Sequence, residues 1–196
     1  MHYTIFDIMA NHVIIQPPIM QMETSVVHSE YLERAVTINI YMPSKIKYLD
    51  QVSLVLFNDG QDLIKMSFDE IFSDLLASGS IEPIVCVGIH CGPERKMEYG
   101  TAYSADFNGR GAKAGLYSKF IFDELLPFIR KKYNAPSFKD KSFAGFSLGA
   151  LSAMDIAWNY ASEFRKVGLF SPSLWWRRKG YEDGYDDEQD RLMHLQ

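Results

Sequence analysis

The chain has 196 residues, of which 47% are hydrophobic and 23% charged, a composition that predicts one globular domain over residues 1–196 and excludes disordered, collagen-like and coiled-coil proteins. Its net charge of -5, from 20 basic and 25 acidic residues, argues against a nucleic-acid-binding protein, which would carry a basic excess. No apolar run reaches the roughly 18 to 20 residues of a membrane-spanning helix, and the first residues lack the basic start of a signal peptide, so we expect a cytoplasmic protein without membrane contact.

Five segments have the pattern of β-strands. Residues 35–43, AVTINIYMP, alternate apolar and polar side chains, which predicts a half-exposed antiparallel edge strand near the amino terminus. Four later segments are short and mostly apolar, as expected for parallel strands that are covered on both faces: residues 53–58, 84–90, 141–145 and 166–171.

Three segments between these strands have the apolar spacing of amphipathic helices. The first is expected to begin after Ser67, which has the spacing of a capping box with Glu70. The second covers residues 114–132, where we expect Pro127 to bend or restart the helix, because proline lacks the amide hydrogen and crowds the preceding turn. The third covers residues 148–160.

This alternation of strands and helices predicts an α/β fold, with a mostly parallel sheet flanked by helices and antiparallel strands at its amino-terminal end. Ligands of such sheets bind beyond the carboxyl ends of the strands. We therefore expect a ligand-binding or catalytic site in the turns that follow Asn58, His90, Gly145 and Ser171.

Residues 145–149 read Gly-Phe-Ser-Leu-Gly and match G-x-S-x-G, the turn that presents a nucleophilic serine in α/β-hydrolases. The motif directly follows a predicted strand and directly precedes a predicted helix, which is the setting this turn requires. A side chain at Gly145 or Gly149 would collide with the neighbouring strand or helix, so the turn requires glycine at both positions. We therefore predict Ser147 as the nucleophile, the alternative being a glycine-rich packing turn with an incidental serine.

An acyl-transfer site also needs backbone N–H groups that bind the oxyanion. The N–H of Leu148 is the first candidate, because a helix begins there and its first N–H groups are free. The N–H of Gln61 is the second, in the segment FNDGQDL, residues 57–63, which follows a central strand. Alternatively, residues 58–60 form an ordinary polar turn.

Six motifs occur along the chain in an order that is similar to one family: VLFNDGQDL (55–63), PIVCVGIH (83–90), RKMEYG (95–100), FDELLPFIRKKY (122–133), AGFSLG (144–149) and FSPSLWW (170–176). They resemble the Putative esterase family of α/β-hydrolases, which includes esterase D, enterochelin-type siderophore esterases and carbohydrate-linked esterases. The resemblance implies a serine esterase of α/β-hydrolase fold that acts on a small-molecule ester, with Ser147 at the nucleophile position and Gln61 and Leu148 at the oxyanion positions.

The catalytic base is the missing part of this interpretation. In α/β-hydrolases the acid and the histidine follow the nucleophile in the chain. His194 is the one histidine after Ser147, and it stands in no strand-loop setting, whereas His90 ends a central strand but precedes the nucleophile. We expect the acid and the histidine beyond residue 196, so that the chain is the amino-terminal part of a longer esterase. If it ends there, the alternative is a non-catalytic binding or scaffold protein.

Substrate-binding candidates come from the same edge of the predicted sheet. The polar loop of residues 91–113 contains Arg95, Glu98 and Tyr99, which resemble an R-x-x-E-Y element of the family. Arg95 either pairs with a substrate carboxylate or phenolate or forms an ion pair with Glu98. Trp175 and Trp176 either stack on a sugar or aryl ring or divide into one core residue and one lid support. Asp59, in the turn before Gln61, completes the candidates.

Two further features carry no chemistry in this interpretation. Cys86, in the apolar run of residues 84–89, is expected to be a reduced buried thiol. With Cys91 as the second cysteine, the sequence excludes a disulfide scaffold, and no spacing of ligands indicates a metal site or another cofactor. Residues 181–190 hold six acidic residues and no basic one, so the rest of the chain is close to neutral. We interpret this segment as a solvated loop, with an interaction tail as the alternative.

Overall fold

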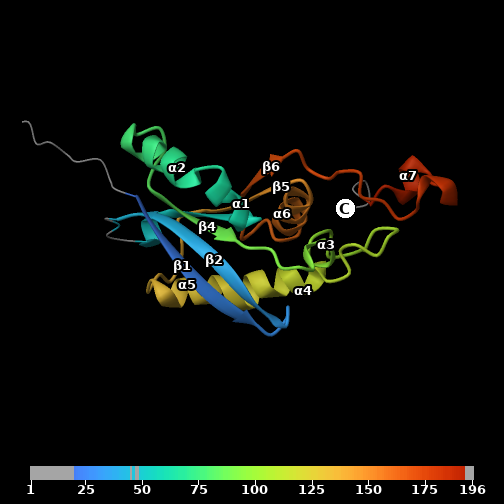
Figure 1. The fold of residues 1–196 in the computed structure, drawn as a ribbon, viewed down its shortest axis with the longest axis horizontal. Coiled ribbons are helices and arrows are strands. Elements are labelled where there is room, and N and C mark those ends of the chain that lie inside the picture. Colours follow the sequence, from blue (N-terminus) through green and yellow to red (C-terminus); the bar gives the residue numbers. More distant parts are fainter. Residues whose placement is uncertain (1–19, 45, 47–48, 193–196) are drawn as a thin grey trace, which may run out of the picture.

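A computed structural model describes residues 20–44, 46 and 49–192, and its centre is a six-stranded sheet (Figure 1). In chain order the strands are β1 (Met20–Ser29), β2 (Arg34–Pro43), β3 (Ser53–Asn58), β4 (Ile84–Ile89), β5 (Lys141–Phe146) and β6 (Lys166–Phe170). Across the sheet their order is β1-β2-β4-β3-β5-β6. β2 pairs antiparallel with β1 and with β4, and the other three pairs are parallel. The predicted α/β fold with antiparallel amino-terminal strands is confirmed.

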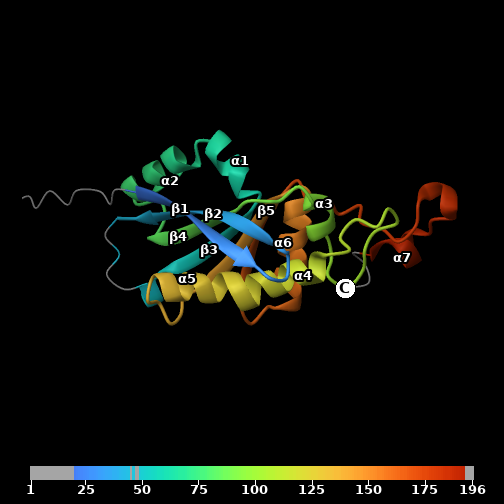
Figure 2. The ribbon, with the colours of Figure 1, turned by 60° about the horizontal axis from the view of Figure 1, so that its bottom comes forward.

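Helices cover both faces of this sheet (Figure 2). The helical elements are η1 (Leu49–Gln51), α1 (Gly60–Lys65), α2 (Phe68–Ala77), α3 (Arg95–Glu98), α4 (Ala114–Lys119), η2 (Phe120–Leu125), α5 (Leu126–Lys132), α6 (Leu148–Asn159), η3 (Tyr181–Asp183) and α7 (Asp187–Asp190). On one face, Phe72 and Leu76 of α2 pack into a small apolar cluster with Cys86. On the other face, η2, α5 and α6 contribute to the main core, in which Phe120 and Leu151 are fully buried.

Two local predictions are wrong. β2 is not an edge strand, because β1 pairs with it along all ten residues and leaves most of its side chains buried. Ser67 does not cap α2 with its side chain. It lies in the left-handed region, at φ 50°, and its N–H donates to Ile64 O (3.2 Å) in the turn that ends α1. The turn after α1, a helix that was not predicted, thus fixes the backbone conformation of Ser67.

The expected bend or restart of the long helix at Pro127 takes the form of a π-helical turn, and the helix does not restart. The chain remains helical from α4 through α5, but residues 120–125 form a π-helical turn, η2, directly before Pro127 enters the first turn of α5. Because proline cannot donate a backbone hydrogen bond and its ring crowds the preceding carbonyl, a widened turn accommodates it without breaking the helix. The helix therefore spans the sheet as one rod (Figure 2).

The acidic segment is mostly exposed and contains two helical turns, η3 and α7. The Asp186 side chain caps α7 by accepting from the N–H groups of Glu188 and Gln189, and Asp190 is buried beside Lys179, at 3.2 Å. The predicted solvated loop thus has local order of its own. Among the helices of the described residues, none is both long and apolar enough to cross a membrane.

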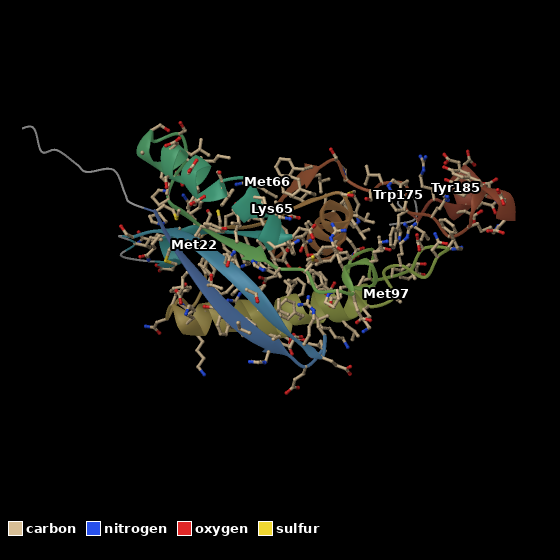
Figure 3. The ribbon with its side chains drawn as sticks, in the orientation of Figure 1. Met22, Lys65, Met66, Met97, Trp175 and Tyr185 are labelled. Atoms are coloured by element: carbon tan, nitrogen blue, oxygen red, sulfur yellow. The ribbon has the colours of Figure 1, made fainter. Side chains whose placement is uncertain are left out.

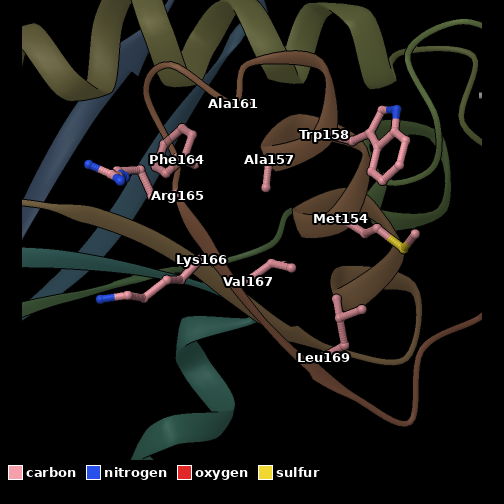
Figure 4. A pocket seen from close by; sticks show the side chains of 9 residues that line it. All are labelled: Met154, Ala157, Trp158, Ala161, Phe164, Arg165, Lys166, Val167 and Leu169. Carbon is pink, nitrogen blue, oxygen red and sulfur yellow. The ribbon is translucent and has the colours of Figure 1, made fainter.

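The outer edge of β6 has no strand partner within the described part of the chain. Beside it, α6 and β6 enclose a groove of about 590 Å³, in which Met154, Trp158, Val167 and Leu169 supply apolar side chains (Figure 4). Trp158 is 62% exposed and Val167 39% exposed. An unpaired strand beside exposed apolar side chains favours association with a second chain.

We expect the chain to self-associate at this edge as its concentration rises. Val167→Lys would place a charge in the apolar groove and should shift the chain toward monomer, measured by sedimentation velocity over a concentration series. Ile71→Lys, at a 50% exposed position on α2, is the matched control. Equal effects of the two substitutions, or a wild-type chain that stays monomeric, would contradict this expectation.

Candidate active site

Ser147 occupies the strand-to-helix turn between β5 and α6 in a strained backbone conformation. Its φ is 52° and its ψ is -117°, a combination that residues with a side chain rarely adopt. Three N–H groups donate to its carbonyl oxygen, from Ala150 (3.1 Å), Leu151 (3.2 Å) and Ser173 (3.1 Å), and its own N–H donates to Phe170 O (3.0 Å). The surrounding backbone therefore fixes this turn, while Ser147 remains exposed to solvent.

The two glycines of the motif permit the close approach of neighbouring segments, as predicted. A Cβ atom at Gly145 would lie 2.5 Å from backbone atoms of Gly149 in α6. A Cβ atom at Gly149 would lie 2.6 Å from Asp59 Oδ2 and 3.0 Å from Asn58 Cβ, at the end of β3. Any larger residue would push α6 away from β5 or β3, and the turn would open.

Asn58 joins this turn to the end of β3. Its side chain is fully buried, and Nδ2 donates to Gly149 O (2.7 Å), while Oδ1 accepts from the hydroxyl of Tyr117 (2.5 Å). The sequence pattern around Asn58 indicates only a possible polar turn, and this contact is not visible in it because Gly149 is 91 residues away in the chain.

The N–H groups of Leu148 and Gln61, the predicted oxyanion donors, each lie in the first turn of a helix, α6 and α1. N–H groups at that position have no partner within their own helix. The Gln61 side chain is held by Cys91, whose N–H donates to Gln61 Oε1 (3.1 Å) and whose sulfur accepts from Gln61 Nε2 (3.2 Å). The two donors stand at the ends of the adjacent parallel strands β5 and β3.

Arg95 forms a bidentate ion pair with Asp59. Arg95 Nε and Nη2 donate to the two carboxylate oxygens at 2.6 and 2.7 Å, and the Asp59 side chain is 3% exposed. The alternative of an ion pair between Arg95 and Glu98 is wrong. Glu98 instead accepts two hydrogen bonds from Arg34, at 2.7 and 2.6 Å, and Arg34 is too distant in sequence for spacing to reveal it.

Tyr99 is fully buried, and its hydroxyl accepts from the N–H of Asp59 (3.2 Å). It packs edge-on against Tyr117, with ring centroids 5.2 Å apart, and burial raises the pKa of both phenols well above their usual value. The two tyrosines are therefore neutral at physiological pH, and their hydroxyl groups hydrogen-bond to Asp59 and Asn58 at the end of β3.

The two tryptophans divide into one core residue and one exposed residue. Trp176 is fully buried, donates from Nε1 to Ser104 O (3.1 Å), and fills the space that Gly100 and Gly111 leave open. Trp175 is 45% exposed, and the guanidinium carbon of Arg110 lies 4.6 Å from its ring centroid. Figure 3 shows Trp175 on the segment that follows β6. With Glu98, Tyr99 and Trp176 buried, Arg95 and Trp175 are the predicted substrate contacts that remain partly open to solvent.

Ser173 is a site residue that the sequence analysis missed. It follows β6, is 3% exposed, and its Oγ lies 3.2 Å from Ser147 Oγ. Ser173 belongs to the FSPSLWW motif. Its place in the turn after β6, a parallel neighbour of β5, is the sequence feature that could have indicated a position near Ser147.

None of the histidines in the described residues contacts Ser147. His28 lies on the edge strand β1, and His90 follows β4, which β3 separates from β5. His90 is half-buried, and burial lowers its pKa. His194 lies outside the described residues. Within the ranges that the structure covers, no group of three or more His, Cys, Asp or Glu side chains is arranged to hold a metal ion.

The sheet order, the flanking helices and the strained serine turn define a domain of the α/β-hydrolase type. Residues 29–194 match the family described as Putative esterase, and the chain belongs to this family.

Solved structures with the same fold include an enterochelin esterase from Shigella flexneri, which is 20% identical with a TM-score of 0.67 over 84% of this chain and 39% of its own. A ferulic acid esterase is 20% identical with a TM-score of 0.63, over 91% of this chain and 67% of its own. The BES protein from Bacillus cereus is 22% identical with a TM-score of 0.66, over 89% and 68%.

Among curated proteins, the uncharacterized protein YjcH of Bacillus subtilis (strain 168) is 25% identical over 150 residues, which is 74% of this chain. The chain thus spans 58% of the length of YjcH and 39% of the length of the enterochelin esterase.

Removing the guanidinium of Arg95 should leave the Asp59 carboxylate buried without its ion partner. We expect Arg95→Ala to lower the free energy of unfolding by about 3 kcal/mol, measured by urea denaturation. Lys65→Ala is the matched control, because Lys65 pairs with Asp62 at the surface, where such a pair contributes about 0 to 1 kcal/mol. Equal stability of Arg95→Ala and wild type would show that the ion pair does not hold the turn.

Proposed function

We propose that the chain is a serine-dependent carboxylic-ester hydrolase that works through an acyl-enzyme on Ser147. The observation that carries this proposal is the backbone of Ser147, which is held at φ 52° and ψ -117° between a parallel strand and a helix N-terminus. Strain of this kind persists where the surrounding structure enforces it, and it presents the hydroxyl outward. Membership of the Putative esterase family supports the same class of reaction.

In the proposed reaction, Ser147 Oγ attacks the acyl carbon of the ester, and a general base takes the hydroxyl proton. The N–H groups of Leu148 and Gln61 stabilise the negative charge on the carbonyl oxygen. The alcohol leaves with the proton, and water then releases the acid from Ser147. The base and the acid that orients it lie outside the described residues in this proposal, since neither His28 nor His90 contacts Ser147.

We propose a small ester as the substrate, with siderophore-linked and sugar-linked esters as the two candidate classes. The names of two structural neighbours, an enterochelin esterase and a ferulic acid esterase, support an ester that carries an aromatic group. Trp175 offers a half-exposed ring for such a group, and the guanidinium of Arg110, which pairs with Asp106, lies against this ring.

The second candidate function is a non-catalytic binding or scaffold protein that uses the same surface. The observation that favours it is the lack of a histidine at Ser147 among the described residues. The two functions differ in whether the Ser147 hydroxyl reacts as a nucleophile.

In the complete natural protein, a fluorophosphonate probe should form a covalent adduct on Ser147, identified by mass spectrometry of the peptide that contains it. Ser147→Ala should abolish this adduct, because the attacking oxygen is gone. Ser162→Ala, at an exposed serine after α6, should keep it. A complete natural protein that forms no adduct at Ser147 would support the binding protein instead.

Trp175→Ala should weaken the reaction of Ser147 with a probe that carries a phenyl group and leave the reaction with a small alkyl probe unchanged. Loss of one aromatic stacking contact should reduce the ratio of the two second-order rate constants about fivefold. Tyr103→Ala is the matched control, since Tyr103 is an 86% exposed aromatic residue of the 91–113 loop. A constant ratio in Trp175→Ala would remove Trp175 from the substrate site.

A further inference from the structure

Ser173 places a second hydroxyl beside Ser147 that the mechanism above does not use. Its side chain is 3% exposed, and its Oγ lies 3.2 Å from Ser147 Oγ. Its backbone N–H donates to Ser147 O at 3.1 Å. One residue of the turn after β6 thus contacts both the side chain and the backbone of the candidate nucleophile.

The contact between Ser173 and Ser147 allows two directions of hydrogen bonding, because either hydroxyl could be the donor. A buried hydroxyl is unfavourable unless it forms a hydrogen bond, and in the described residues Ser147 Oγ is the recorded partner of Ser173 Oγ. Each hydroxyl has one proton to donate. If Ser147 donated to Ser173, its proton would point away from any base. If Ser173 donates, the Ser147 proton remains free for a base, and Ser147 Oγ is held in place.

We propose that Ser173 is a positioning residue whose hydroxyl donates a hydrogen bond to Ser147 Oγ. This inference rests on the proposed function of Ser147. In the ground state the bond selects one rotamer of a side chain that is otherwise exposed. As the base removes the Ser147 proton, negative charge grows on Oγ, and the same bond strengthens because its acceptor becomes charged. The proton of Ser173 stays on Ser173 throughout, so no additional base is needed.

A purely structural role for Ser173 makes a different prediction. Removing a hydroxyl that only fills space or satisfies packing changes stability, but it does not slow the reaction of Ser147 at a temperature where the protein is folded. Ser152 is the matched case within this chain. Its hydroxyl is also buried, at 2% exposure, but it bonds to the backbone of Gly100, accepting from N (2.8 Å) and donating to O (3.2 Å).

The test is the second-order rate constant for phosphonylation of Ser147 by a fluorophosphonate, measured between pH 6 and 10 on the full chain. We expect Ser173→Ala to react about tenfold more slowly across this pH range, because the transition state loses one hydrogen bond to a charged acceptor while the base that sets the pH profile is unchanged. Ser173→Thr keeps the hydroxyl and should recover most of the rate. Ser152→Ala should lower the thermal midpoint and leave the rate constant of wild type unchanged at a temperature where the protein is folded.

A Ser173→Ala chain with the rate and pH profile of wild type would overturn the positioning role while Ser147 remains the nucleophile. A complete wild-type protein that is not modified at Ser147 would overturn the proposed function, and the role of Ser173 with it. The wild-type arm of the experiment therefore distinguishes the two failures.

Discussion

The site depends on how closely two backbone turns approach at the carboxyl ends of β3 and β5. Gly149 O accepts a hydrogen bond from Asn58 Nδ2, and a single added carbon at Gly149 would stand 2.6 Å from Asp59 Oδ2. This contact sets the separation between Ser147 on one turn and the N–H of Gln61 on the other. Since both belong to parallel neighbours, the spacing of the strands and the missing side chain of one glycine together determine the geometry of the candidate oxyanion site.

A layer of buried charges and phenols keeps this contact rigid. Asp59 is neutralised by Arg95, Glu98 by Arg34, and Tyr99 receives the N–H of Asp59. Buried charges persist when they are paired and hydrogen-bonded, so each pair ties a loop to the sheet edge. Trp176 completes the layer by filling the space that Gly100 and Gly111 leave open, whereas its neighbour Trp175 is half-exposed.

Periodicity and motif order predicted much of the fold. Each strand from residue 35 onward was predicted to within about two residues, and so was the long helix interrupted near Pro127. Short elements were missed, because α1, α3 and α7 have six residues or fewer and carry little periodic signal. The predicted capping role of Ser67 is wrong for a related reason. The backbone of Ser67 belongs to the turn that ends α1, and its left-handed conformation does not allow the side chain to cap α2.

The sequence by itself determined which turn carries the candidate nucleophile, because G-x-S-x-G needs particular residue types within five positions of one another. It also determined the family, through the order of six motifs. The tertiary structure decided the partners: Arg95 with Asp59 rather than Glu98, Arg34 with Glu98, Asn58 with Gly149, and Ser173 with Ser147. These pairs join residues 26 to 91 positions apart, and such long-range contacts follow from strand order and chain packing, which no local pattern encodes.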